Sequence, residues 1–424
     1  MKKLWCLTLV LAAPLAGCGP LDDDEKGVQE LNVNSRYTVE SVHVIGGSNF
    51  RMPEPLRILI NSFVGQKFDR SALDKVADRL KSDLHVSDVK INVTRGSEPD
   101  HVSVEFQVKP QTFDLLMGRS LYASKEGWSG EGGATFNLHG NAFTFGLLSD
   151  GDSLVERYAG IRVKYERKNV GTERLRLRFE FDSYHDEWNL ATLDAAQPGE
   201  IYRSRQVFTP MATVVIFQPL EVDFGVSFAR LRVPLSVPTQ TEGGGTAAAK
   251  TESSNAVVST LRYHQRWGSE GGQKQHELDG SYGVEAGSNL LDTDEVFTRH
   301  MARARYKFRH ARSSIELGFL SGVIHGNAPL YERFALGDST TLRGWNKFDL
   351  DPLGGSHVVH GSIDYGYRFL QVFYDTGAVW DRAQEREQKQ SAGVGFKKEY
   401  FQLAVAFPLR AGRTDPIFYA GMKF

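Results

Sequence analysis

Residues 173–182 read ERLRLRFEFD and alternate between two kinds of side chain. Leu175, Leu177, Phe179 and Phe181 fall on one face of an extended chain, and the residues between them are Arg, Glu and Asp. Successive side chains of a β-strand point to opposite faces, so alternation with a period of two predicts a strand. This stretch therefore predicts a strand with one apolar and one charged face.

The same pattern recurs from about Thr112 to the C-terminus, where we expect about sixteen strands and no helices. Their expected starts are Phe113, Trp128, Ala142, Ala159, Thr172, Arg203, Glu221, Ala256, Lys274, Phe297, Ser313, His357, Gln371, Ser391, Tyr400 and Pro416. A soluble β-sandwich also alternates, but its strands average about five or six residues, and these segments are longer. Long charged side chains on one face and Leu, Phe, Tyr and Ala on the other suit a water-filled lumen and a lipid exterior.

The spacers between these strands alternate between short and long. The short ones include NVG at 169–171, and the longest are Pro238–Asn255 and Asp182–Glu200. Tight turns at one end and long loops at the other are typical of outer-membrane β-barrels. The fold class predicted for residues 111–424 is therefore an all-β transmembrane barrel of antiparallel strands.

Composition excludes several classes of protein. The formal net charge is −2, so there is no overall attraction to nucleic acid, and we expect no nucleic-acid partner. The two cysteines, Cys6 and Cys18, both lie in the first twenty residues, which rules out a disulfide framework.

The N-terminus carries a targeting segment. Lys2 and Lys3 precede an apolar run from Leu4 to Leu15 that is too short to span a membrane. An ordinary secretory signal with an incidental cysteine is one interpretation. The residues Leu-Ala-Gly-Cys ending at Cys18, however, resemble the lipobox of bacterial lipoproteins, which implies cleavage before Cys18 and its lipidation. Residues 1–17 would then be a signal peptide and residues 18–36 an acidic lipidated tether.

Residues 37–110 predict a small α+β domain. A short strand at 39–45 is followed by two helical segments, the second with Leu73, Val76 and Leu80 on one face, and then by two alternating strands. The order strand-helix-helix-strand-strand resembles a POTRA domain, the polypeptide-transport-associated module of outer-membrane proteins.

A motif within residues 331–345, YERFALGDSTTLRGW, resembles the BamA/TamA superfamily of outer-membrane assembly and translocation barrels, also called the bacterial surface antigen family. Its most specific part matches the family's hydrophobic-Arg-Gly-aromatic sequence at the tip of the sixth long loop. Asp338 departs from the glycine that the family usually has there, and downstream segments match the next two strand motifs. The matched positions are Leu342, Arg343, Gly344 and Trp345 in the loop, Asp364, Asp375 and Gly377 in the strands, and the terminal aromatic Phe424, which commonly closes such barrels.

The resemblance implies that this loop folds back into the lumen. Arg343 would then meet a carboxylate of the inner wall, Asp375 first and Asp364 as the next candidate. A bidentate pair between arginine and carboxylate is planar and directional, which lysine does not reproduce. Gly344 would allow a close backbone approach and Gly377 would clear space on the facing strand.

Catalytic and cofactor motifs give no competing prediction. The GDSL sequence at Gly151–Leu154 occurs in one hydrolase family, but here it lies between two strands and lacks the expected distant Asp-x-x-His. Neither metal-ligand spacing nor a phosphate-binding glycine loop is present. We therefore expect no enzymatic activity, no metal and no cofactor.

The function implied by the resemblance is assistance in assembly, insertion or translocation of polypeptides at the outer membrane, with the POTRA domain in the periplasm receiving clients by β-augmentation. The expected partners are outer-membrane lipids, unfolded outer-membrane or secreted clients, and other subunits of the assembly machinery. Two alternatives remain open: a dedicated two-partner exporter of one secreted protein, and a plain channel or structural barrel.

The lipobox gives the first testable prediction. The mature protein should begin at Cys18 and carry acyl chains, because the lipoprotein pathway cleaves directly before the modified cysteine. Intact-mass measurement of protein purified from membranes checks this. Cleavage at another residue, or an unmodified Cys18, would show that the segment is an ordinary signal peptide.

Overall fold

The structure, a computed structural model of the 424-residue chain, describes residues 35–46, 54–84, 86–110, 113–138, 140–150, 154–172, 174–234, 249–268, 274–382, 384–398, 400–410 and 415–423. Cys18, the predicted signal peptide and tether, most of the GDSL sequence and Phe424 lie outside these residues, so the predictions about them stay predictions. The chain divides into two compact units, the first ending at Pro110 and the second beginning at Gln111.

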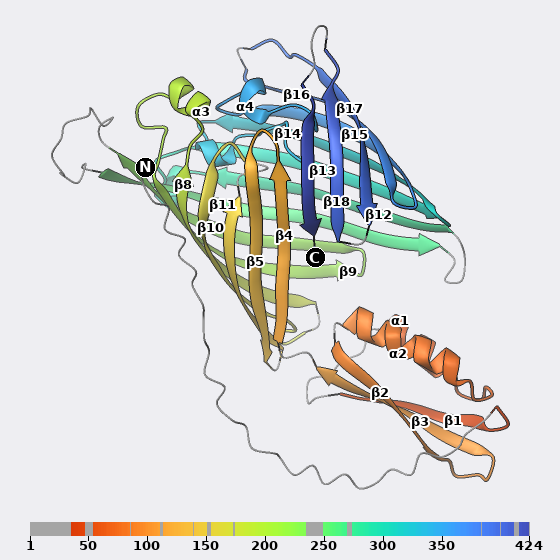
Figure 1. Ribbon diagram of the computed structural model, residues 1–424. Coiled ribbons are helices and arrows are strands. Elements are labelled where there is room, and N and C mark those ends of the chain that lie inside the picture. Colours follow the sequence, from red (N-terminus) through yellow and green to blue (C-terminus); the bar gives the residue numbers. More distant parts are fainter. Residues whose placement is uncertain are drawn as a thin grey trace, which may run out of the picture. The chain divides into compact units, whose positions relative to one another are not determined.

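The first unit has the predicted element order. It contains β1 (Thr38–Ile45), α1 (Glu54–Asn61), α2 (Arg70–Leu84), β2 (Val86–Arg95) and β3 (His101–Pro110). The sheet order is β1-β3-β2, with β1 parallel and β2 antiparallel to the central strand β3 (Figure 1).

One face of this sheet packs against the helices. Leu73 and Leu80 of α2 are fully buried against Val104 and Phe106 of β3. The helix begins at Arg70 because the Asp69 carboxylate accepts hydrogen bonds from the backbone N–H groups of the next turn, at 2.9 and 3.3 Å. Such a cap stabilises a helix by about 1 kcal/mol.

The second unit is a closed barrel, and the described residues contain sixteen strands in it (Figure 1). They are β4 (Phe113–Ala123), β5 (Gly127–Leu138), β6 (Asn141–Asp150), β7 (Arg157–Arg167), β8 (Leu175–Glu187), β9 (Ser204–Phe217), β10 (Leu220–Pro234), β11 (Ala249–Gly268), β12 (Lys274–Gly287), β13 (Phe297–His310), β14 (Ser313–Gly326), β15 (His357–Tyr367), β16 (Leu370–Trp380), β17 (Lys389–Lys398), β18 (Phe401–Pro408) and β19 (Ile417–Lys423). Each pairs antiparallel with the next, and β19 pairs with β4 to close the ring. The predicted all-β barrel of about sixteen strands is confirmed.

The two faces of the barrel wall differ as the alternation predicts. Outward side chains such as Leu147, Phe224 and Phe319 are 70%, 55% and 49% exposed, which suits contact with lipid. Inward charges pair across neighbouring strands: Arg162 of β7 lies 2.8 Å from Asp182 of β8. Because lipid offers no hydrogen bonds to these charges, the water-filled lumen is the favourable side for them.

The connections at the two rims differ in length. Turns such as 218–219, 311–312 and 368–369 lie at what we call the turn rim, and the longer connections, including 188–203, 288–296 and 327–356, lie at the loop rim. Because strands alternate in direction, every second connection belongs to the same rim.

Two predictions about the loop-rim segments are wrong. Short helices α3 (Leu190–Ala195) and α4 (Lys347–Leu350) occur where none was expected. The predicted loop Pro238–Asn255 ends too late, because β11 starts at Ala249. The predicted loop Asp182–Glu200 begins too early, because β8 continues to Glu187. These strand ends carry polar residues on both faces, so no alternation marked them. Among the described residues, no helix is long and apolar enough to span a bilayer.

The alternation of rims predicts which segments are accessible from one side of the membrane. Leu290, in the 288–296 connection, is 96% exposed, and Lys168 lies in the turn between β7 and β8 at the other rim. With a membrane-impermeant maleimide on intact cells, Leu290→Cys should be labelled and Lys168→Cys should be labelled only after the outer membrane is permeabilised. Wild-type protein, whose cysteines are Cys6 and Cys18, gives the background. Labelling of Lys168→Cys alone on intact cells would mean that the orientation is inverted.

Candidate functional site

The connection 327–356 between β14 and β15 folds into the barrel, and we call it the lumen loop. Its residues Phe334, Leu336 and Leu342 are at most 5% exposed and pack against Ile324 and Val358 of the wall. A loop rich in polar residues would ordinarily lie in water. Its burial therefore needs specific partners on the wall.

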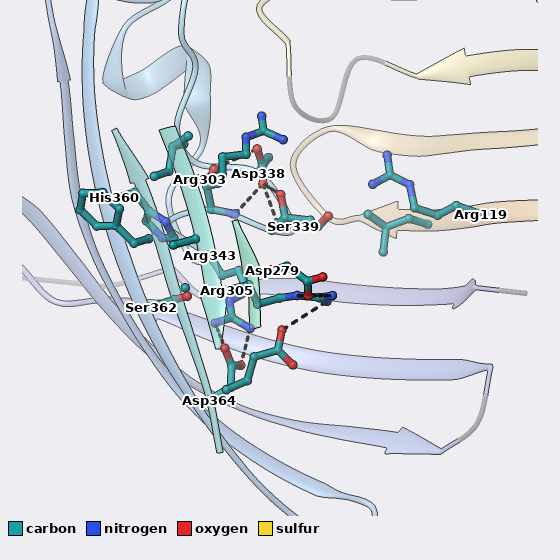
Figure 2. A pocket seen from close by; sticks show the side chains of 18 of the residues that line it. Arg119, Asp279, Arg303, Arg305, Asp338, Ser339, Arg343, His360, Ser362 and Asp364 are labelled. Atoms are coloured by element: carbon teal, nitrogen blue, oxygen red, sulfur yellow. Dashed lines mark hydrogen bonds and ion pairs between the residues drawn. The ribbon is translucent and has the colours of Figure 1, made fainter. Parts of the chain in front are cut away.

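Arg343 is the main anchor of the lumen loop. Its Nε and Nη2 atoms donate to the two oxygens of Asp375, both at 2.8 Å. Its Nη1 and Nη2 atoms donate to the two oxygens of Asp364, at 2.8 and 3.2 Å. The side chain of Arg343 is 8% exposed, that of Asp375 is 0% and that of Asp364 is 17%. Figure 2 shows Arg343 beside Asp364. The expected first partner and the next candidate thus bind Arg343 at the same time, one at each fork of the guanidinium.

Further contacts fix the orientation of Arg343. Its backbone N–H donates to Asp375 Oδ2 at 3.0 Å, and its guanidinium carbon lies 3.7 Å from the centre of the Phe373 ring. Burial alone would lower the pKa of Arg343, but the hydrogen bonds to Asp375 and Asp364 outweigh it and hold the pKa above its ordinary value. The arginine is therefore charged at any physiological pH.

The residues on either side of Arg343 also bind the wall. Leu342 donates its backbone N–H to His360 Nε2 at 3.1 Å, so that nitrogen of the imidazole accepts. Gly344 donates to the hydroxyl of Tyr419 on β19 at 3.1 Å, and Trp345 Nε1 donates to the carbonyl of Gln390 at 2.8 Å. The motif tip therefore reaches from β15 to β19.

Two glycines are required by close approach. Gly344 has φ +94°, and a Cβ there would lie 3.1 Å from the carbonyl carbon of Ala406. A Cβ on Gly377 would lie 2.9 Å from the carbonyl oxygen of Val359 and 3.1 Å from the Leu336 side chain. Both are tighter than ordinary packing, so a side chain at either position would push the loop from the wall.

Asp338, the departure from the family pattern, organises its own turn. Its Oδ1 accepts the backbone N–H groups of Thr340 and Thr341 at 2.5 and 2.6 Å, and its Oδ2 accepts the Thr341 hydroxyl at 2.9 Å. Aspartate commonly stabilises turns in this way. A local hydrogen-bonded turn thus occupies the position of the glycine usual in the family.

Several functional contacts were not predicted from the sequence. Phe373, His360 and Tyr419 bind the motif, and the buried Lys347 pairs with Glu126 at 3.2 Å. Phe373 and His360 stand two and four residues from the aspartates on the same strands, so strand alternation placed them on the luminal face. Nothing in the sequence indicated Tyr419 or Glu126.

Beside the anchor lies a luminal cavity of about 990 Å³ whose lining includes several charged side chains. Arg119, Arg303, Arg305 and Asp279 face it, together with Asp338 of the loop (Figure 2). His264, Glu277 and Asp279 bring potential metal-ligand atoms within 4.8 Å of one another. Arg305 already donates to Asp279 at 2.6 Å, and its positive charge would oppose a cation there.

The fold and the anchored loop define a class: an outer-membrane β-barrel with a loop bound inside its lumen. The sequence profile of the Omp85 superfamily domain matches residues 87–410, and the chain belongs to the Omp85 superfamily. The expected membership is confirmed.

Solved structures share this fold. BamA from Haemophilus ducreyi lacking POTRA domains 1–3 is 13% identical, with a TM-score of 0.55 over 92% of this chain and 85% of that one. CdiB from Acinetobacter baumannii is 14% identical, with a TM-score of 0.51 over 92% of this chain and 74% of that one. None of the curated proteins matches this sequence.

The anchor gives a prediction for stability of the loop. Arg343→Ala removes the partner of the buried Asp375 and of the partly buried Asp364. Breaking a buried pair costs about 3–5 kcal/mol, less where lumen water screens it. The barrel should still form, because its cross-strand hydrogen bonds do not involve the loop. Arg343→Lys should be nearly as harmful, because an ammonium cannot fill both forks. Protease sensitivity of residues 327–356 in purified barrels measures the effect.

A double-mutant cycle with Asp375→Ala, and a second with Asp364→Ala, separates the two pairs. In each cycle the combined defect should be smaller than the sum of the single defects. Arg305→Lys, at a half-exposed luminal arginine, is the matched control and should leave the loop resistant. Fully additive defects would mean that Arg343 and the aspartates act separately.

Proposed function

We propose that this protein assists the insertion or translocation of polypeptides at the outer membrane. Membership of the Omp85 superfamily supports a role of this general kind. We further propose that the first unit is a periplasmic POTRA domain, that Cys18 is lipidated, and that the protein is not an enzyme. Other subunits of an assembly machinery would be partners.

The observation that carries this proposal is the weak closure of the barrel. Within the described residues, β19 and β4 share five residue pairs, from Tyr419 with Ala123 to Lys423 with Arg119. By comparison, the neighbouring pair β18 and β19 shares six, and β12 and β13 share fourteen. Fewer cross-strand hydrogen bonds lower the cost of parting two strands, and a parted edge can accept an incoming strand.

The first unit supplies a second candidate surface for clients. In the order β1-β3-β2, strands β1 and β2 are the edges of the sheet. The start of β1 already pairs with residues 65–67 through Val39, so β2 and the later part of β1 are the edges for a client. An edge strand presents unpaired backbone N–H and C=O groups, which an extended client can pair with whatever its sequence. Binding through the backbone fits a receptor for many different clients.

Cross-linking the seam tests the proposal. Ser120 lies opposite Met422 across the β4–β19 seam, and Leu403 lies opposite Ala420 across β18–β19. Opposite residues in antiparallel strands are close enough for a disulfide. Oxidised Ser120→Cys/Met422→Cys should fail to support the growth or outer-membrane protein content of depleted cells, and reduction should restore it. The control pair Leu403→Cys/Ala420→Cys should remain active when oxidised.

Depletion in the native host separates the candidate functions. Loss of many outer-membrane proteins supports assembly, and loss of one secreted protein supports the dedicated exporter. Altered permeability alone, with normal protein content, would contradict both and favour a plain channel. Full activity of the locked seam would show that the barrel does not open there.

A further inference from the structure

We propose that the loop rim of strands β13 to β16 carries a binding site for the phosphate groups of outer-leaflet lipid. Its residues form what we call the rim patch: His300, His325, His357, Trp380, Arg382 and Arg386. Assignment to the outer leaflet rests on the orientation that the Leu290→Cys and Lys168→Cys labelling tests, in which the loop rim faces away from the periplasm.

The rim patch lies on the lipid-facing side of the barrel. Residues paired across neighbouring strands share a face, and His300 pairs with Val323, which in turn pairs with His357. His357 pairs with Trp380. On the same face, farther from the loop rim, Phe319 is 49% exposed and belongs to the apolar band. The patch thus begins where this band ends, which is the depth of the lipid headgroups.

Contacts between side chains arrange the patch as a row of two halves, each joined within itself. His300 Nδ1 and the Tyr282 hydroxyl are hydrogen-bonded at 2.8 Å. The His300 ring lies edge-on to the His325 ring, with ring centres 6.5 Å apart. Arg382 Nη2 donates to His325 Nδ1 at 2.5 Å. This half of the row therefore ends in a guanidinium.

The second half of the row ends in the same way. His357 stacks on Trp380 with ring centres 5.3 Å apart and planes 19° from parallel. The guanidinium carbon of Arg386 lies 5.4 Å from the centre of the Trp380 ring. Arg382 contacts the His325 ring and Arg386 contacts the Trp380 ring. Both arginines thus lie at the depth of the lipid headgroups and present two positive charges there.

Two arginines, Arg382 and Arg386, give the rim patch its positive charge. Among the described residues, neither Arg382 nor Arg386 has a carboxylate partner. The neighbouring acids are engaged elsewhere: Asp381 binds Arg333 and the Ser356 N–H, and Glu387 binds Lys389. Glu385 is exposed. Its single negative charge is smaller than the two positive charges of Arg382 and Arg386, so this part of the patch stays positive.

Phosphate is the ligand that fits this arrangement. The guanidinium fork matches two phosphate oxygens with parallel hydrogen bonds, and basic residues beside the bilayer attract anionic headgroups. The long arginine side chains can reach the headgroup while their stems lie along the aromatic rings. A lipid with two phosphates would bridge Arg382 and Arg386.

Lipid binding to the purified full-length protein in neutral detergent tests the proposal. The probe is diphosphorylated lipid A, with its dephosphorylated form as the reference, and native mass spectrometry measures the bound fraction over a titration. Wild-type protein should bind the phosphorylated form at least about tenfold more tightly, because hydrogen bonds between guanidinium and phosphate are charge-assisted. Arg382→Gln/Arg386→Gln should remove most of this preference.

The control removes two arginines from the opposite end of the same strands. Arg312 and Arg368 lie in the turns at the turn rim, and Arg368 sits 5.8 Å from the centre of the Tyr367 ring. Arg312→Gln/Arg368→Gln should leave the preference intact. Equal losses in the two double variants, or equal binding of both lipids by wild-type protein, would overturn the proposal. The measurement needs no client, so its failure would leave the proposed transport function untouched.

Discussion

Pairing of every backbone amide within the chain is the constraint on which this structure depends. Lipid supplies no hydrogen bonds, so an open sheet edge in a bilayer would cost several kcal/mol for each unpaired group. Closure of β19 on β4 satisfies this constraint for the two strands that would otherwise be edges, and the other fourteen pair with a neighbour on each side. It also fixes which side chains face lipid and which face water, because register and alternation are locked together around the ring. The seam is at once necessary and the shortest ladder described in the barrel.

Closure creates a wet lumen, and that lumen makes the Arg343 anchor possible. A loop that enters the lumen loses contact with bulk water and meets the fixed charges of the barrel wall. One guanidinium between two carboxylates satisfies both forks of the arginine and fixes direction, whereas apolar packing alone would leave the loop free to slide. Gly344 and Gly377 let the backbones approach closely enough for these bonds to form. The lumen loop thereby contacts β15 through His360 and the closing strand β19 through Tyr419, next to the seam.

Much of this architecture could be predicted from the sequence, for a physical reason. Alternation such as Leu175 to Phe181 survives because every strand has one lipid face and one wet face, so the predicted starts lie close to the observed strands. Prediction failed where both faces are wet, as at Ala249–Asn255 of β11. Arg343 and its partners were indicated by a family motif, but simultaneous binding of Asp364 and Asp375 depends on the register of β15 against β16. Neither the contact of Tyr419 nor the rim patch could be predicted, because both depend on which residues the strand register places side by side.

The central claim is that the lumen loop is bound to the barrel wall through Arg343 and its neighbours. Hydrogen–deuterium exchange of the purified wild-type barrel tests it directly, because the amides of Leu342, Arg343 and Gly344 all donate to wall side chains. The peptide containing residues 342–345 should exchange as slowly as peptides from the paired strands β12 and β13. Exchange within seconds, at the rate of the exposed connection 288–296, would contradict the account.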